Sequence, residues 1–184
     1  MRMLDLFCGL GGASAAFRDV GWEVIGVDIE PKFHPEIVAD LTNWHWEGGK
    51  VDLIWASPPC TYFSRHGQPG LFPNEPEPSM DLVNATYRII REVTPAWYVI
   101  ENVKGAIPYL GKPKQTILAV CLWGFFPPLG KFNKWVGYKA CHHYKDDAKN
   151  AWRPSTRDPA ERAVIHPAIS DRLLFAITNQ LTYW

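Results

Sequence analysis

Cys60 is the residue whose type and setting most directly suggest chemistry. It follows Pro58 and Pro59, which come straight after an apolar run over residues 51–56. Such a run predicts a β-strand, and the proline pair predicts that the strand stops abruptly in a stiff turn. In open α/β sheets, ligands bind beside the carboxyl ends of strands. We interpret Cys60 as a nucleophile held at that edge; the alternative is a small buried hydrophobic residue, as most free cysteines are.

Glu101 is a second candidate for chemistry, because it also follows an apolar run, residues 96–100, that predicts a strand. Burial at the end of such a strand favours a protonated carboxylic acid. A thiolate and a carboxylic acid that face one pocket suit covalent attack on an electrophilic ring, with protonation of that ring. We interpret Cys60 and Glu101 together as a catalytic pair, whereas Glu101 alone would also fit a cap on the following turn.

Three earlier strand ends carry residues that suit a nucleotide. A glycine-rich turn, residues 8–12, follows the predicted strand 3–7 and opens a short helix, so backbone amides can approach a ligand closely. Asp28 ends the next strand, where a carboxylate can accept both hydroxyls of a ribose. Asp40 ends the third strand and could accept from an exocyclic amine. Each acid alone would also fit a cap or a turn, but together these strand ends predict an adenosine-containing cofactor.

The composition is that of an ordinary soluble protein. The 184 residues are 47% hydrophobic and 21% charged, with a net charge of zero, so any nucleic-acid contact must be local. Four widely spaced cysteines without a C-x-x-C pair suggest neither a disulfide framework nor a zinc site, and we expect no metal. Nine tryptophans fit either edge packing or a stacking surface for bases. With no secretion signal and no membrane-length apolar run, we expect a cytoplasmic protein.

Predicted strands and helices alternate along the chain. This alternation predicts an α/β fold with a mostly parallel, doubly wound sheet, in a single domain over residues 1–184. The apolar spacing in residues 80–93 predicts an amphipathic helix, and residues 158–181 predict a C-terminal helix. Residues 113–123 predict a helix and a short strand. Residues 65–79, rich in Gly, Pro and Asn, predict a mobile loop directly after the nucleophile.

Three motifs together resemble those of the cytosine-5 DNA methyltransferases, in matching order and spacing: residues 5–12, 58–64 and 101–103. The resemblance covers residues 3–125 well, and residues 152–163 are similar to the tail of short, phage-type members. It implies a Rossmann-like, S-adenosylmethionine-dependent methyltransferase fold. It also implies S-adenosylmethionine as cofactor and DNA as partner, with the target cytosine flipped out of the duplex. A bacterial or phage-infected cell, and a role in restriction–modification or phage self-protection, fit such a protein.

The resemblance further implies roles for individual residues. Cys60 attacks C6 of cytosine, Glu101 assists at N3, and the loop over residues 65–79 forms a lid. The residues implied to hold the cofactor are Phe7, Gly9, Leu10, Gly11, Gly12, Asp28, Ile29, Asp40, Leu41 and Pro58. The residues implied to contact DNA are Ser64, Asn102, Lys131 and Lys134, of which the two lysines stand in for arginines of the family.

The chain is far shorter than typical members of that family. No stretch between residues 125 and 157 is long enough for a separate target-recognition domain, which we therefore expect to be absent or minimal. Sequence preference should then be short or loose, or a partner chain or homodimer should supply it. RNA as substrate and a non-catalytic S-adenosylmethionine-binding protein are the alternatives. A nicotinamide oxidoreductase fits less well, because Ser14 occupies the third glycine position of the dinucleotide fingerprint.

Overall fold

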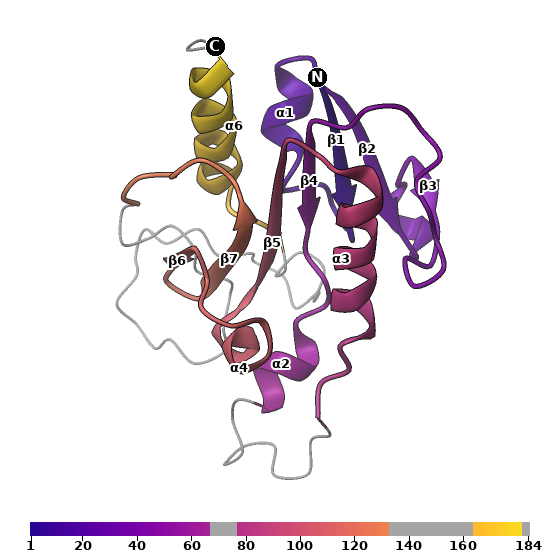
Figure 1. The fold of residues 1–184 in the computed structure, drawn as a ribbon, viewed down its shortest axis with the longest axis vertical. Helices are drawn as coiled ribbons and strands as arrows, with labels where there is room; N and C mark the ends of the chain where they lie inside the picture. The colour runs from indigo at the N-terminus through magenta and orange to yellow at the C-terminus, as the bar shows by residue number, and fades with distance from the viewer. Residues whose placement is uncertain (67–76, 133–163, 182–184) are drawn as a thin grey trace.

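A seven-stranded sheet runs through the computed structural model, which describes residues 1–66, 77–132 and 164–181 (Figure 1). The strand order is β3-β2-β1-β4-β5-β7-β6. The first five of these are parallel, and β7 runs antiparallel to β5 and β6. The strands are β1 (Arg2–Leu6), β2 (Glu23–Asp28), β3 (Ile37–Val38), β4 (Leu53–Ala56), β5 (Trp97–Val103), β6 (Gln115–Ile117) and β7 (Val120–Phe125). The predicted mostly parallel sheet is confirmed.

Helices cover both faces of this sheet, so the predicted doubly wound α/β fold is also confirmed (Figure 1). On one face α1 and α6 share a core with Met3 and Trp55, and on the other face α3 packs against Leu4 and Ile54. Because successive strand residues point to opposite covered faces, β4 is apolar at every position. The helices are α1 (Ala15–Asp19), α2 (Thr61–His66), α3 (Asp81–Val93), α4 (Ile107–Leu110) and α6 (Pro167–Leu181), with 3-10 turns η1 (Pro31–Phe33) and η2 (Lys104–Ala106).

The C-terminal helix α6 follows the predicted apolar stripe. Ile169, Leu173 and Ile177 are fully buried in the core that α6 shares with α1. The Ser170 hydroxyl donates a hydrogen bond of 2.6 Å to the Ala13 carbonyl, which fixes α6 against the chain just after the glycine turn. The predicted start of this helix at residue 158 lies outside the described residues. In the described part of the chain, no helix is long and apolar enough to cross a membrane.

The segment after β5 differs from its prediction. Residues 113–123 form no helix; they supply β6 and the first part of β7, joined by a tight turn in which Leu118 has a φ of 54°. The expected helix is wrong because pairing with a neighbouring strand, which local spacing does not show, decides this segment. Antiparallel pairing with β7 also extends β5 to Val103, so Glu101 and Asn102 lie within its carboxyl end.

Candidate active site

The carboxyl ends of β1, β4 and β5 lie side by side at one edge of the sheet. The register pairs Leu6 with Ala56, and Ala56 with Ile100. The chain continues from Ala56 through a short turn to Cys60, and from Ile100 directly into Glu101. Cys60 is half-buried, and Glu101 is only 1% exposed. The structure therefore brings the two predicted catalytic residues to the ends of neighbouring strands.

Asn102 ties these two strand ends together. Its side-chain Nδ2 donates a hydrogen bond of 2.9 Å to the carbonyl of Pro58, and its Oδ1 accepts one of 2.9 Å from the Val103 amide. Asn102 is fully buried, and both ends of its amide bond to the backbone. The turn that carries Cys60 is therefore fixed to the strand that carries Glu101. The structure gives Asn102 this positioning role, and its contact with DNA stays a prediction.

The helix that follows Cys60 packs directly on the turn that follows β5 and Glu101. Helix α2, which the sequence patterns did not indicate, begins right after Cys60, whose carbonyl accepts from the Ser64 amide at 2.9 Å. A Cβ on Gly105 in η2 would lie 2.1 Å from the carbonyl oxygen of Phe63, so the two backbones touch there. The Phe63 and Tyr109 rings pack edge to face with centroids 5.5 Å apart. This packing holds the segment after Cys60 against the segment after Glu101.

The Asp28 carboxylate ties the glycine turn to the end of β2. Its Oδ2 accepts a hydrogen bond from the Gly9 amide at 2.9 Å, and its Oδ1 accepts one from the Glu30 amide at 3.0 Å. Gly9 and Gly11 have φ of 50° and 73°, a region that favours glycine. No heavy atom beyond its chain neighbours lies within 4 Å of where a Cβ on Gly9 would be, so that side of the turn is open.

The other predicted cofactor residues near this turn have different surroundings. Phe7 is half-buried with a φ of 58°, Pro58 is buried, and Leu10 and Ile29 are 53% and 60% exposed. Gly12 is crowded, because a Cβ there would lie 2.5 Å from Cγ1 of Val164. Packing against the segment that leads into α6 therefore accounts for glycine at that position, whereas Leu10 and Ile29 leave apolar surface open at the edge.

Asp40 and Leu41 follow β3 in the connection to β4. Asp40 is exposed, and its Oδ1 accepts hydrogen bonds from the amide and the hydroxyl of Thr42 at 2.9 and 2.8 Å. These bonds lower the pKa of Asp40. Leu41 is 3% exposed and packs in the core that includes α3. The structure thus places an ordered carboxylate at the surface and anchors the next residue in the core, while their contact with adenine stays a prediction.

The predicted DNA contacts are only partly covered by the structure. Ser64 is half-buried in α2, and Lys131 is exposed after β7. Lys134 lies outside the described residues, as do residues 133–157 of the stretch considered for target recognition and residues 67–76 of the predicted lid. The roles of these segments remain predictions.

Asp5 is a buried carboxyl group on β1 that the sequence analysis missed. It is 1% exposed, and burial raises its pKa to about 7, although a hydrogen bond from Ser14 and the charge of Arg18 act in the opposite direction. Within the described part of the chain, its Oδ2 has no hydrogen-bond partner. The available signal was an acid inside an apolar strand, where burial disfavours the charged form.

The cysteines differ in what their surroundings allow. Burial raises the pKa of Cys8 to about 12, and nearby carboxylates act in the same direction. Burial also raises the pKa of Cys121 on β7. Because the thiolate is the nucleophilic form, these two thiols are unsuited to attack. The nucleophilic role of Cys60 stays a prediction.

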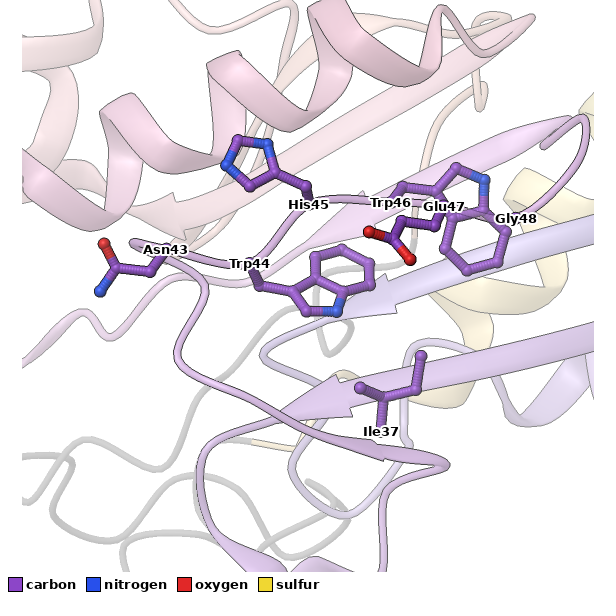
Figure 2. Close-up of a pocket in the computed structure, with 7 residues that line it drawn as sticks. All are labelled: Ile37, Asn43, Trp44, His45, Trp46, Glu47 and Gly48. Atoms are coloured by element: carbon purple, nitrogen blue, oxygen red, sulfur yellow. The ribbon is translucent and has the colours of Figure 1, made fainter.

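The connection between β3 and β4 lines a pocket beside β3 (Figure 2). Its cavity volume is about 510 Å³, and it is lined by Ile37 and residues 43–48, none of which is a predicted site residue. The rings of Trp44 and Trp46 pack there with centroids 6.1 Å apart, and both lie against the core, which is the edge packing considered above.

Among the residues that the structure describes, no three His, Cys, Asp or Glu side chains gather as metal ligands would.

Comparison with known proteins finds relatives that are named as Type II methyltransferases. The chain is 31% identical over 122 residues to the Type II methyltransferase M1.HphI of Haemophilus parahaemolyticus, covering 56% of this chain and 32% of that protein. It is 31% identical over 137 residues to M.XorII of Xanthomonas oryzae pv. oryzae, covering 64% and 31%. It is 30% identical over 139 residues to M.AquIA of a Picosynechococcus strain, covering 64% and 54%. The chain therefore spans between about a third and about half of these relatives.

The chain can be assigned to a family because a family model matches most of it. A solved structure, the Entamoeba histolytica methyltransferase EhMeth, overlaps only loosely, with a TM-score of 0.41 and 18% identity over 60% of this chain and 40% of that one. The model of the C-5 cytosine-specific DNA methylases matches residues 1–120, which include the glycine turn and both predicted catalytic residues. This chain belongs to the C-5 cytosine-specific DNA methylase family.

Proposed function

We propose that this chain transfers a methyl group from S-adenosylmethionine to C5 of cytosine in DNA, through a covalent adduct between Cys60 and C6. One observation carries the proposal. Cys60 and Glu101 stand at the ends of neighbouring strands, and a hydrogen bond from Asn102 to Pro58 joins the turn that carries Cys60 to the strand that carries Glu101. Family membership supports the reaction class, and the relatives named as Type II methyltransferases support DNA as the substrate.

The edge formed by β1, β2 and the segment after β3 suits S-adenosylmethionine. Two backbone amides orient the Asp28 carboxylate at the end of β2, and we expect it to take the ribose hydroxyls. The open side of Gly9 leaves room for the methionine part, and Phe7 and Ile29 offer apolar surface for the adenine. Asp40 presents a carboxylate for the adenine amine. When bound, S-adenosylmethionine supplies an electrophilic methyl group on a sulfonium.

The chemistry starts with addition to the ring, because C5 of cytosine is a poor nucleophile. The Cys60 thiolate forms a bond from Sγ to C6, which breaks the aromaticity and moves an electron pair toward C5. Glu101 donates its proton toward N3 and holds the exocyclic amine, which stabilises the adduct. C5 then takes the methyl group, and the electron pair of the broken sulfur–methyl bond stays on the donor's sulfur. A water removes the C5 proton, the electron pair of that C–H bond expels the Cys60 sulfur, and N3 returns its proton to Glu101 as the ring is restored.

The fold positions the reacting groups for each of these steps. The bond from Asn102 to Pro58 and the contact of Gly105 with Phe63 hold the thiol and the carboxyl at a fixed spacing. Such positioning is worth several orders of magnitude in rate, and it is lost by small displacements. A cytosine stacked inside a duplex cannot reach Cys60, so the target base must be flipped out before the reaction.

Target choice is part of the same proposal. The chain has a net charge of zero, so charge alone gives it little general affinity for a polyanion. We expect the chain by itself to prefer a short or loosely defined site, or a partner chain or second copy to supply further specificity.

Transfer of a labelled methyl group tests the proposal. The chain is incubated with methyl-labelled S-adenosylmethionine and either duplex DNA or RNA, and the nucleic acid is digested to nucleosides. The expected product is 5-methyldeoxycytidine from DNA. Label found only in 5-methylcytidine from RNA would move the substrate to RNA. Cofactor binding without any methylated nucleoside would overturn the enzymatic function in favour of a non-catalytic binding protein.

A further inference from the structure

The connection between β3 and β4, residues 39–52, carries no helix and no strand, yet it bears Asp40 and Leu41. Figure 2 shows residues 43–48 of this connection as an extended wall of the pocket beside β3. Within the segment the Asp40 carbonyl accepts from the Asn43 and Trp44 amides, and the carbonyls without such a bond need partners from other segments, from side chains or from water. Whatever supplies those partners determines where the connection, and Asp40 with it, lies.

Arg88 of α3 supplies these partners. Its Nη2 donates to the carbonyls of Leu41 at 2.9 Å and Trp44 at 2.8 Å, with a longer contact to the Thr42 carbonyl at 3.4 Å. The Arg88 side chain is 25% exposed, so most of it is shielded from water. A planar guanidinium holds several acceptors in fixed directions, which a lysine ammonium does not. Arg88 therefore fixes the backbone of residues 41–44.

Glu92 and His45 orient the guanidinium. Arg88 Nη1 donates to both carboxylate oxygens of Glu92, one helical turn further along α3, at 3.0 and 3.1 Å. The ring nitrogen Nδ1 of His45 lies 3.0 Å from the same Nη1 and 3.2 Å from Glu92. The guanidinium is thus held from α3 and from the connection itself, and it is a fixed anchor rather than a free surface charge.

Thr42 transmits this position to Asp40. Its amide and hydroxyl both donate to Oδ1 of Asp40, at 2.9 and 2.8 Å. No donor among the described residues bonds to Oδ2, so this oxygen is available to accept from a ligand. Arg88 thus holds the backbone of residues 41–44, and Thr42 in that segment holds Oδ1 of Asp40. Without Arg88 this segment could shift, and Oδ2 of Asp40 would shift with it.

We propose that Arg88 is a positioning residue for adenine recognition. By fixing residues 41–44, it presents the Asp40 carboxylate to the exocyclic amine of the cofactor's adenine. The inference rests on the proposed function, because it requires S-adenosylmethionine at this edge. It predicts that Arg88 governs the preference for adenine over a purine without that amine, which a general loss of stability would not change.

Calorimetric binding of two ligands tests this role. S-adenosylhomocysteine carries the amine, and S-inosylhomocysteine has a carbonyl in its place. We expect the wild-type chain to bind the first about tenfold more tightly, as one hydrogen bond to a carboxylate allows. Arg88→Met should bring this ratio close to one, and Arg88→Lys should restore only part of it. Arg91→Met, on the same helix and exposed, should keep the wild-type ratio.

The possible outcomes separate this role from the proposed function. A wild-type ratio retained in Arg88→Met would overturn the role of Arg88, as would a wild-type chain that binds both ligands equally. A wild-type chain that binds neither ligand would overturn the proposed function, and this inference with it. If Arg88→Met does not fold, Thr42→Val tests the same series of bonds at an exposed position, because it removes the hydroxyl bond to Asp40. An unchanged ratio in Thr42→Val would then reject the inference.

Discussion

At the scale of single residues, burial decides which groups at the sheet edge can ionise. Burial raises the pKa of Cys8 to about 12 and that of Asp5 to about 7. Residue types alone could indicate Cys60 and Glu101, because each follows a strand-like run. They could not reveal Asp5, because its burial depends on packing by distant segments such as α6.

Asp5 should make stability depend on pH. With a pKa of about 7 when folded and 3.8 when unfolded, the folded chain binds more protons between these values. Its contribution is therefore complete below about pH 4 and is lost as the pH rises to about 7. The shift corresponds to roughly 4 kcal/mol. Asp5→Asn cannot ionise, so its free energy of unfolding should lack this fall. Urea unfolding at pH values between 4 and 8 measures it.

Asp19→Asn is the matched control, because it removes an exposed carboxyl group on α1. It should leave the pH dependence as in the wild type. If the free energies of unfolding of Asp5→Asn and of the wild type change in parallel between pH 4 and 8, the burial of Asp5 does not set its ionisation.

At the scale of elements, those with a strong local pattern could be predicted. Strand β4 is an apolar run ended by prolines, and α3 shows a clear helical spacing. Helix α2 could not be predicted, since its six residues are too few for a hydrophobic period. The β6–β7 hairpin could not be predicted either, because pairing with β5 rather than local spacing decides it. Contacts that fix the site, such as Gly105 against Phe63, are equally non-local.

Gly105→Ala should change the spacing between Cys60 and Glu101, the proposed nucleophile and acid. The added Cβ would lie 2.1 Å from the Phe63 carbonyl oxygen, and a backbone atom cannot move aside as a flexible side chain can. Helix α2 and the Cys60 turn must therefore shift relative to β5. A shift near 1 Å in such a site lowers the rate by about a hundredfold, so we expect kcat to fall by at least about tenfold. The KM for the cofactor should change much less. Steady-state kinetics measure both constants.

Gly49→Ala is the control for this substitution. Its Cβ would approach only the mobile end of the Arg2 side chain, at 3.1 Å, so activity should stay as in the wild type. A folded Gly105→Ala chain with the wild-type kcat would show that contact between α2 and η2 does not set the catalytic spacing.

At the scale of the whole molecule, strand order assembles the site. Strand β4, which leads to Cys60, lies between β1, which leads to the glycine turn, and β5, which carries Glu101. Alternating strands and helices could predict a parallel sheet class. They could not predict the antiparallel insertion of β7 between β5 and β6, because strand order follows from pairing between distant segments.

The proposed choice of target makes a testable prediction about sequence preference. The match covers between 31% and 54% of the three relatives described above. If the chain methylates DNA by itself, mapping of 5-methylcytosine across a long natural DNA should show a short or loosely defined site. A long, strictly defined site for the isolated chain would contradict this expectation.

Trapping on DNA that contains 5-fluorocytosine tests the central claim most directly. Fluorine at C5 cannot leave as a proton does, so the bond between Cys60 and C6 cannot be released. With S-adenosylmethionine present, we predict a stable covalent complex of DNA with the wild-type chain and with Cys8→Ala, and none with Cys60→Ala. An equally abundant complex with Cys60→Ala, or none with a folded wild-type chain that binds the cofactor, would contradict the assignment of Cys60 as the nucleophile.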